Sequence, residues 1–339
     1  MTLTELLIAV AVGLLVMLAA VSTLSAARRG AGTVDAASQL RDNARFATDM
    51  IQRLAVQAGF EDLASASAPY AGSRVRYAQI NLKTAIDELE PSVFGYDNAT
   101  PKGVSGFTKR SASDGGNGSD VLVLRYQGVR TNIDPDDIYN YSDGSMINCA
   151  GNAPSLGATN RDDRIYSILS VGVSKTAGSE PALMCTTLGT EKTGQQPFTT
   201  PLIAGVESFQ VLYGVDNVTP NAALKPGNTA HSIPTRYLRA SQLTVAGDTN
   251  ATHANWRRVR SLRIGMVLRG PDRSAQSATQ QKLFPLGNRY ANADDTGSSY
   301  TVTDARLRQT VTFTVHLRNC QNQGYQPDAS TQACDVTLP

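Results

Sequence analysis

The first 27 residues of the chain are almost wholly apolar. Between Leu3 and Ala27 the only charged side chain is that of Glu5, and about 20 consecutive apolar residues are enough for a helix to cross a bilayer. The run is longer than the apolar core of a cleaved signal peptide, and no basic segment stands ahead of it. We therefore predict that residues 1–27 form a helix that lies in a membrane or in the core of a filament.

The helical pattern continues in amphipathic form over residues 28–59. After Gly30 and Gly32, small and apolar residues recur at spacings of three and four, which places them on one helical face. They are Leu40, Ala44, Ala47, Ile51, Leu54 and Ala58, and the opposite face carries Arg41, Asp42, Arg45, Asp49 and Arg53. We expect this half of the helix to pack on a globular head, and we expect the helix to end before Gly59.

Residues 60–339 show the pattern of a β-rich head. Val121–Gln127 is predicted to be a buried strand, and Ile165–Val173 and Ala182–Thr186 are predicted to be strands as well. In three further segments apolar residues alternate with others, which indicates half-buried strands; these are Val206–Val215, Leu262–Leu268 and Val311–Leu317. Strands and helices do not alternate, so we predict an α+β fold in which the long N-terminal helix packs on an antiparallel sheet. Long loops are expected at Asp216–Thr235 and Gly270–Asp304, as binding surfaces or flexible segments.

Composition and charge narrow the class of protein. The 339 residues carry a formal net charge of +2, and the arginines between Arg257 and Arg269 are dispersed rather than clustered, so no nucleic-acid partner is predicted. Abundant Gly, Ser, Thr, Asn and Asp are typical of a turn-rich extracellular β protein. The single tryptophan, Trp256, is interpreted as a core residue at the start of a strand, with a surface anchor for a partner as the alternative.

The cysteines indicate an oxidising compartment. The chain has four, Cys149, Cys185, Cys320 and Cys334, which allow three pairings that the sequence does not distinguish. Their spacing does not match a zinc site, so two disulfides are expected. We take the pairing of neighbours, Cys149–Cys185 and Cys320–Cys334, as the prediction.

Two acidic clusters are weak candidates for calcium, and no other cofactor or metal is expected. Carboxylate and carbonyl oxygens with glycines between them suit a hard cation, and ordinary turns have the same composition. The first cluster contains Asp114, Asn117 and Asp120, and the second contains Asp134, Asp136 and Asp137. Catalytic motifs are absent from the sequence, and His231, His253 and His316 lie in unrelated settings, so the chain is not predicted to be an enzyme.

Glu5 is the unusual residue of the apolar run. An acidic side chain costs roughly 2.5–3.5 kcal/mol at the centre of a membrane helix and less near the interface. The nearest basic side chains, Arg28 and Arg29, are at the far end of the run. An α-amino group, of this chain or of a neighbouring copy, is therefore the best partner, and the alternative is that Glu5 reaches water at the interface. Arg28 and Arg29 would place the head in the cytoplasm by the positive-inside rule, which a removed basic leader ahead of Met1 would reconcile with the cysteines.

The segment MTLTELLIAV, Met1–Val10, resembles the mature N-terminus of type IV pilins and pseudopilins. Four further segments resemble minor pilins of the PilW family, in the family's order: Gly116–Tyr126, Pro201–Asp216, Trp256–Leu268 and the strand that ends in VHLRN at Asn319. The resemblance implies that a leader is cleaved, that Met1 becomes the methylated N-terminus, and that Glu5 pairs with an N-terminal amine. Met1 departs from the phenylalanine that the family usually has first.

The resemblance also implies a function by assembly. A PilW-like minor pilin takes part in the initiation of a type IV pilus at its tip, with other minor pilins, the major pilin and a tip adhesin as partners, and so contributes to adhesion and twitching motility. It would lie in the inner membrane with its head in the periplasm, and in the pilus at the cell surface after assembly. Two alternatives stay open: a minor pseudopilin of a type II secretion system, and a membrane-anchored periplasmic binding module.

Overall fold

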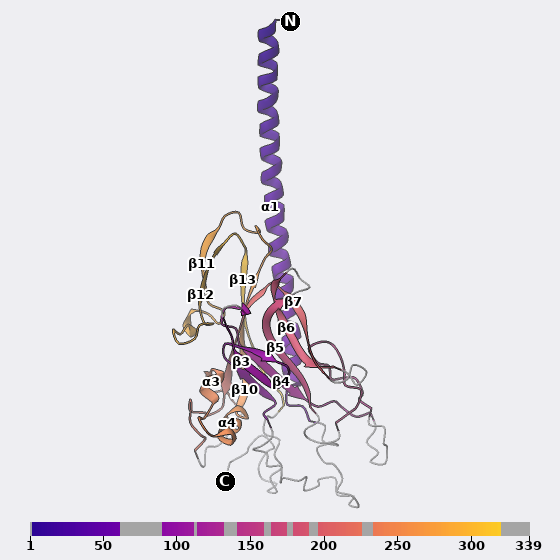
Figure 1. Ribbon diagram of the computed structural model, residues 1–339, viewed down its shortest axis with the longest axis vertical. Coiled ribbons are helices and arrows are strands. Elements are labelled where there is room, and N and C mark those ends of the chain that lie inside the picture. The colour runs from indigo at the N-terminus through magenta and orange to yellow at the C-terminus, as the bar shows by residue number, and fades with distance from the viewer. Residues whose placement is uncertain are drawn as a thin grey trace, which may run out of the picture.

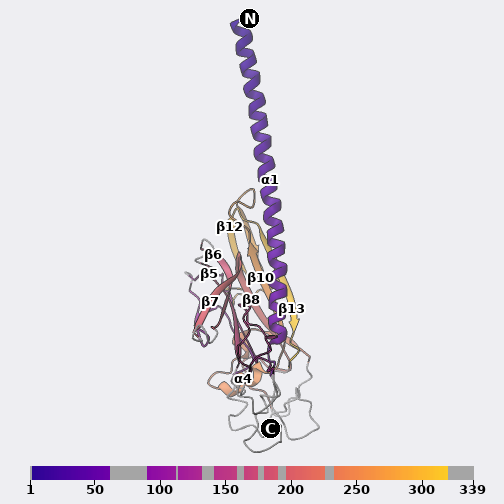
Figure 2. The same ribbon diagram turned by 90° about the vertical axis from the view of Figure 1, so that its right-hand side faces the viewer.

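A single long helix dominates the computed structural model, which describes residues 2–61, 90–111, 114–131, 141–158, 164–174, 179–189, 196–225 and 233–319. Helix α1 spans Leu3–Gln57 without a break. Its N-terminal half projects alone from the head, and its C-terminal half lies along the head (Figures 1 and 2). Gly59 follows the helix with a φ of 76°, a left-handed conformation that glycine adopts without steric cost and that commonly ends helices. The predicted helix and its stop are thus both seen.

Two antiparallel sheets form the described part of the head. The first has the strand order β1-β4-β5-β6-β7 and the second the order β13-β10-β8-β9. The strands of the first are Val93–Tyr96 (β1), Val121–Tyr126 (β4), Ile165–Ser174 (β5), Glu180–Leu188 (β6) and Pro197–Ala204 (β7). Those of the second are Val206–Val215 (β8), Arg236–Leu238 (β9), Val259–Arg269 (β10) and Arg308–His316 (β13).

The strand register confirms the apolar faces expected from the sequence. On β10, Leu262, Ile264 and Met266 lie opposite Tyr213, Val211 and Phe209 of β8. On its other side, the same three residues lie opposite Val315, Phe313 and Val311 of β13. Such cross-strand apolar pairs stabilise a sheet. The α+β fold, with a long N-terminal helix on antiparallel sheets, is therefore confirmed.

The main core lies between the two sheets and the C-terminal half of α1. Its members include buried residues of α1, β4, β5, β6, β8 and β10. On the helix they are Leu40, Ala44, Ala47, Ile51, Leu54 and Ala55. Small alanines alternate with large aliphatic side chains on this stripe, so the helix backbone lies close to the sheets. The helix contacts β13 most extensively, and also β4 and β10.

The predicted loop Gly270–Asp304 is wrong in part. It contains a second hairpin, β11 (Thr279–Leu283) paired with β12 (Tyr300–Asp304), and a short 3-10 helix at Asn288–Tyr290. The hairpin stands away from the main sheets on the side of α1 (Figure 1). Because it buries little on either face, its sequence lacks the apolar alternation that reveals a strand.

Other elements were not expected from the sequence. Strands β1, β7 and β9, and the hairpin of β2 (Ala99–Lys102) and β3 (Gly106–Lys109), are short or lie at sheet edges. Two short helices, α3 (Ala240–Leu243) and α4 (Thr249–Trp256), separate β9 from β10. Trp256 is fully buried, as predicted, but it ends α4 and does not begin a strand. Asp216–Thr235 contains no strand or helix in its described residues 216–225 and 233–235.

Candidate functional site: the N-terminal helix

The N-terminal half of α1 exposes apolar side chains on every side. Residues 2–29 are all exposed, and α1 is long and apolar enough to cross a membrane. The large apolar side chains that are more than half exposed are Leu3, Leu6, Leu7, Ile8, Val10, Val12, Leu14, Leu15, Val16, Met17, Leu18, Val21 and Leu24. Each would gain about 1.5–3 kcal/mol on full burial. An apolar surface of this size requires a lipid or protein environment.

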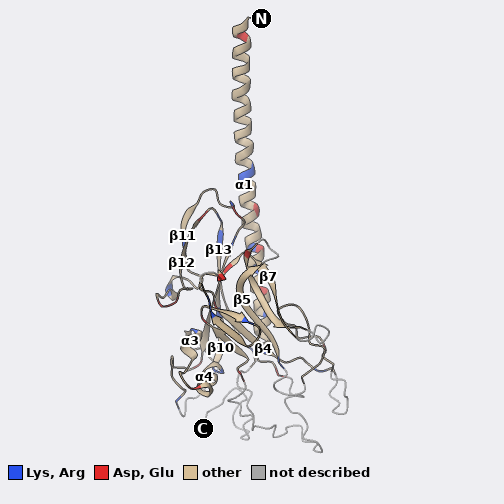
Figure 3. Cartoon of the chain, in the orientation of Figure 1, with Lys and Arg blue, Asp and Glu red and all other residues tan. Residues whose placement is uncertain are grey.

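Charge is confined to the two ends of this apolar half, as Figure 3 shows. Glu5 lies at the start of the helix, and Arg28 and Arg29 follow the apolar run. At 1.5 Å per residue, Glu5 and Arg28 are roughly 35 Å apart along the helix axis. The arginines of the same chain therefore cannot pair with the Glu5 carboxylate.

Glu5 has a partner that the sequence analysis did not consider. Its carboxylate Oε2 accepts a hydrogen bond from the backbone N–H of Thr2 at 2.8 Å, and its own N–H donates to Thr2 Oγ1 at 3.4 Å. This is a reciprocal capping box, and the motif Thr-x-x-Glu at residues 2–5 is its signal in the sequence. Met1, and with it the predicted pairing of Glu5 to the N-terminal amine, lies outside the described residues. The capping bond occupies one carboxylate oxygen, and a carboxylate can accept further donors.

Four hydrogen bonds fix the C-terminal end of α1 to the described part of the head. The Asn319 side-chain amide donates to the carbonyls of Val56 and Ala58, at 3.1 and 3.2 Å. The Gly59 N–H donates to the carbonyl of Arg125 on β4 at 2.9 Å. The Gln57 side chain accepts from the backbone N–H of Ile147 at 3.1 Å. The last carbonyls of a helix have no partner within it, so Asn319, from a distant part of the chain, satisfies the carbonyl of Val56 together with that of the C-cap residue Ala58.

A network of charges lies where α1 meets the upper part of the head. Arg308 donates to both carboxylate oxygens of Asp304, at 2.6 and 2.7 Å, and to buried Glu207 at 2.6 Å. The hydrogen bonds from Arg308 lower the pKa of Asp304. Arg269 and Arg306 bind Glu180, at 2.6 and 3.2 Å. Burial acts to raise the pKa of Glu180, but these two arginines lower it overall. The network joins β6, β8, β10 and β13, and thus ties the two sheets together below the projecting helix.

The structure joins Cys149 and Cys185 in a disulfide, with their Cα atoms 5.7 Å apart. This is the pairing that the sequence analysis expected. It fixes the segment 141–158 to β6, and a bridge across 36 residues lowers the entropy of the unfolded chain, by about 4 kcal/mol in the chain-entropy model. The second predicted pair, Cys320–Cys334, lies outside the described residues.

The three residues of the first candidate calcium cluster each make separate contacts within the head. The Asp114 carboxylate accepts hydrogen bonds from the backbone and hydroxyl of Ser111, at 2.7 and 2.8 Å. Asp120 is buried and accepts from the backbone N–H groups of Asn98 and Val211. The Asn117 side chain donates to the carbonyl of Glu207 at 3.2 Å. Where the structure describes the chain, no three His, Cys, Asp or Glu side chains form a group that could hold a metal ion. Calcium binding stays a prediction.

A cation of the protein's own lies inside this loop. The guanidinium of Arg110, on a residue only 7% exposed, donates to backbone carbonyls alone in the hydrogen bonds that the structure shows. These are the carbonyls of Ala99 and Val171 at 2.9 Å, Gly115 at 3.1 Å, Ser119 at 3.3 Å and Asp114 at 3.5 Å. Arg110 thus organises the loop that the sequence suggested for calcium.

The remaining candidates from the sequence are the second acidic cluster and the three histidines. Asp134, Asp136, Asp137 and His231 lie outside the described residues. His253 is buried on α4, and His316 is exposed at the end of β13, as expected from its place on the polar face. The two described histidines therefore do not share a site.

The fold defines a class of protein in which one long helix has two roles. Its N-terminal half is able to span a membrane, and its C-terminal half is built into a β-rich head. Residues 168–319, a little under half of the chain, match the family model described as Type IV Pilus-assembly protein W, PilW. The resemblance to the PilW family is therefore confirmed over this segment, and it supports a role in the type IV pilus.

Two further comparisons concern curated proteins and solved structures. No curated protein matches the chain. Among solved structures, the type IV-like pilin TTHA1219 from Thermus thermophilus is similar with a TM-score of 0.36 and 12% sequence identity, over 83% of this chain and 98% of that chain.

Proposed function

We propose that this chain is a minor pilin of the PilW kind, which acts by assembly and not by catalysis. The observation that carries the proposal is the N-terminal half of α1, apolar on all sides and projecting from the head with one carboxylate at its start (Figures 1 and 3). In the membrane, lipid covers this surface. In a pilus, the corresponding helices of other subunits cover it.

Glu5 makes the transfer of the helix from the membrane into the pilus selective. In the isolated chain its carboxylate is held by the backbone of Thr2. In the pilus it accepts a second, charge-assisted hydrogen bond from an N-terminal amine, which is stronger than a neutral one. The amine belongs to Met1 of this chain or to a neighbouring subunit, after removal of a leader and methylation of the new terminus.

The partners are other minor pilins, the major pilin and a tip adhesin, and the place is the pilus tip. Before assembly the chain lies in the inner membrane with its head in the periplasm. The Cys149–Cys185 disulfide supports an oxidising compartment for the head. The PilW match over residues 168–319 favours a pilus over a type II secretion system.

The test compares Glu5→Ala with Asp35→Ala, which removes an exposed carboxylate from the same helix outside its apolar half. Both variants replace the chromosomal gene, and the chain is quantified in membranes and in sheared pili. We expect Glu5→Ala to reach the membrane at the normal level and to fall at least tenfold in sheared pili, and Asp35→Ala to behave like the wild type. Normal recovery of Glu5→Ala in pili would overturn the assembly role of this carboxylate.

A further inference from the structure

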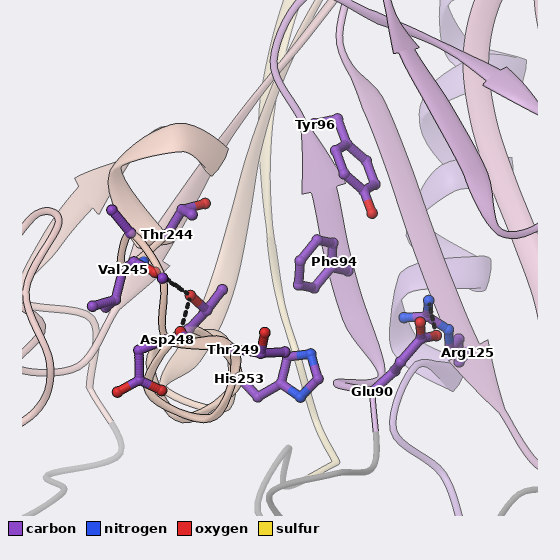
Figure 4. Close-up of a pocket in the computed structure, with 12 residues that line it drawn as sticks. Glu90, Phe94, Tyr96, Arg125, Thr244, Val245, Asp248, Thr249 and His253 are labelled. Carbon is purple, nitrogen blue, oxygen red and sulfur yellow. Dashed lines mark hydrogen bonds and ion pairs between the residues drawn. The ribbon is translucent and has the colours of Figure 1, made fainter.

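A crevice opens at the end of the head that is remote from the projecting helix. It has a volume of about 460 Å³ and lies between β1 on one side and the segment 244–249 with α4 on the other. Figure 4 shows side chains of β1 and α4 pointing into it from opposite walls. Ligand sites of proteins have volumes of roughly 300–1,000 Å³. We name this crevice the distal crevice; one of its lining residues, Arg125, also accepts the Gly59 N–H at the end of α1 through its backbone carbonyl.

One wall of the distal crevice is made of rigid rings. Phe94 and Tyr96 are neighbours on β1, with ring centroids 5.3 Å apart. Phe94 stacks on the buried Trp256 at 4.4 Å, and Tyr96 stacks on Phe107 at 4.1 Å. His253 of α4 meets the Phe94 ring edge-on at 6.4 Å. Because stacking already fixes these rings, a ligand that packs against them loses little side-chain entropy on binding.

The remaining lining mixes the small or apolar residues 245–247 with polar side chains that are nearly balanced in charge. The carboxylate of Glu90 binds the guanidinium of Arg125 at 2.6 Å, and the Glu90 side chain remains 55% exposed. On the opposite wall, Asp248 caps α4 by accepting from the Ala251 N–H at 2.8 Å, and the exposed Thr249 adds a hydroxyl. Two carboxylates against one guanidinium disfavour a phosphate, sulfate or carboxylate ligand.

We propose that the distal crevice binds a neutral saccharide. A sugar ring has an apolar C–H face that packs on a flat ring such as Phe94 or Tyr96, and an edge of hydroxyls that donate to carboxylate and backbone oxygens. Hydrogen bonds to a charged acceptor such as Glu90 are the stronger ones. A cation is the other ligand that aromatic rings attract, but the ion pair of Glu90 with Arg125 at 2.6 Å already neutralises one of the two carboxylates that would hold it. This site is separate from the assembly role and faces away from the membrane end.

Trp256 reports on the distal crevice directly. It is the only tryptophan of the chain and is fully buried, and its ring contacts Phe94 in the wall. The full-length chain is purified in a polyoxyethylene detergent, because maltoside or glucoside head groups would compete. Glucose, galactose, mannose and N-acetylglucosamine are titrated separately to about 50 mM, with choline and sialic acid as the charged comparators. Saturation-transfer NMR follows the ligand, and Trp256 fluorescence follows the protein.

Two variants with matched controls locate the binding. Glu90→Gln removes the exposed carboxylate, and Ala246→Phe fills the crevice from an exposed loop. Of their controls, Asp272→Asn makes the corresponding change from carboxylate to amide and Ala291→Phe makes the same change, both at exposed positions outside the crevice.

We expect at least one neutral sugar to bind with a Kd in the millimolar range, typical of a weak single site. Both crevice variants should weaken it at least tenfold and both controls should leave it unchanged. The proposal is overturned if no neutral sugar binds, if only choline or sialic acid binds, or if the crevice variants bind as the wild type does.

Discussion

Replacing Arg110 by methionine is the sharpest test of how the head is held together. The substitution keeps the length and most of the volume of the side chain but removes every donor. Arg110 connects β2, the loop 114–119 and β5, through the carbonyls of Ala99, Ser119 and Val171. Burial lowers the pKa of its guanidinium, and the charges of Asp114 and Asp120 partly oppose this shift.

The magnitude follows from the carbonyls that remain. A buried acceptor left without a donor costs about 1–3 kcal/mol. The two shortest hydrogen bonds, both 2.9 Å and both in buried surroundings, dominate the effect, and the longer three add less. Removing the need to bury a charge offsets part of the loss, because desolvation of a guanidinium is itself unfavourable. We expect Arg110→Met to destabilise the head by about 3–5 kcal/mol, and Arg110→Lys by about half as much because an ammonium has three donors.

The assay is urea unfolding of the full-length chain in nonionic detergent, followed by Trp256 fluorescence. A change in the midpoint at constant slope measures the change in the free energy of unfolding. Arg273→Met is the matched control, because the Arg273 side chain is 90% exposed, and we expect it to stay within about 0.5 kcal/mol of the wild type. If Arg110→Met were as stable as this control, the hydrogen bonds from Arg110 to the backbone carbonyls would contribute nothing to stability and the reasoning would be refuted.

Three further perturbations test the helix junction and the charge network by the same unfolding assay. Ile51→Ala, at a fully buried position of α1, should cost about 2–5 kcal/mol, whereas Phe46→Ala, at a position 59% exposed, should cost less than about 0.5 kcal/mol; equal costs would contradict the docking of α1. Asn319→Ala removes both hydrogen bonds to the end of α1 and should cost about 1–2 kcal/mol, with faster hydrogen exchange over residues 54–59; unchanged exchange there would count against the capping role. Because Arg308 lowers the pKa of Asp304, their pairing stabilises the fold fully above the ordinary carboxylate pKa near 4 and is lost as the pH falls through the lower folded value. The urea midpoint should therefore fall less steeply below pH 4 in Asp304→Asn than in the wild type, and identical slopes would refute this.

The segments with periodic apolar positions determined the long helix and the main strands of this protein. The apolar run from Leu3 and the spacing of Leu40, Ile51 and Leu54 specify a helix with a free half and a docked half, because side-chain periodicity follows from helix geometry alone. The alternation in β8, β10 and β13 specified their apolar faces for the same reason. Glu5 stands out in sequence because a charge in an apolar run is costly wherever the chain folds.

What lacks a period, or joins distant residues, only the tertiary structure decided. The β11–β12 hairpin and the edge strand β7 bury too little to impose a pattern, and the edge strands β1 and β9 are too short to show one. Asn319 meets the end of α1 from more than 260 positions away, and a capping residue supplied over that distance leaves no local signal. In the sequence, Asp120 resembles a metal ligand because glycines lie near it. In the fold, its carboxylate lies against the backbone of β8 and accepts a hydrogen bond there. Arg110 lies next to that loop in sequence, but only the packing of β2 and β5 around it makes its guanidinium the cation that the loop encloses.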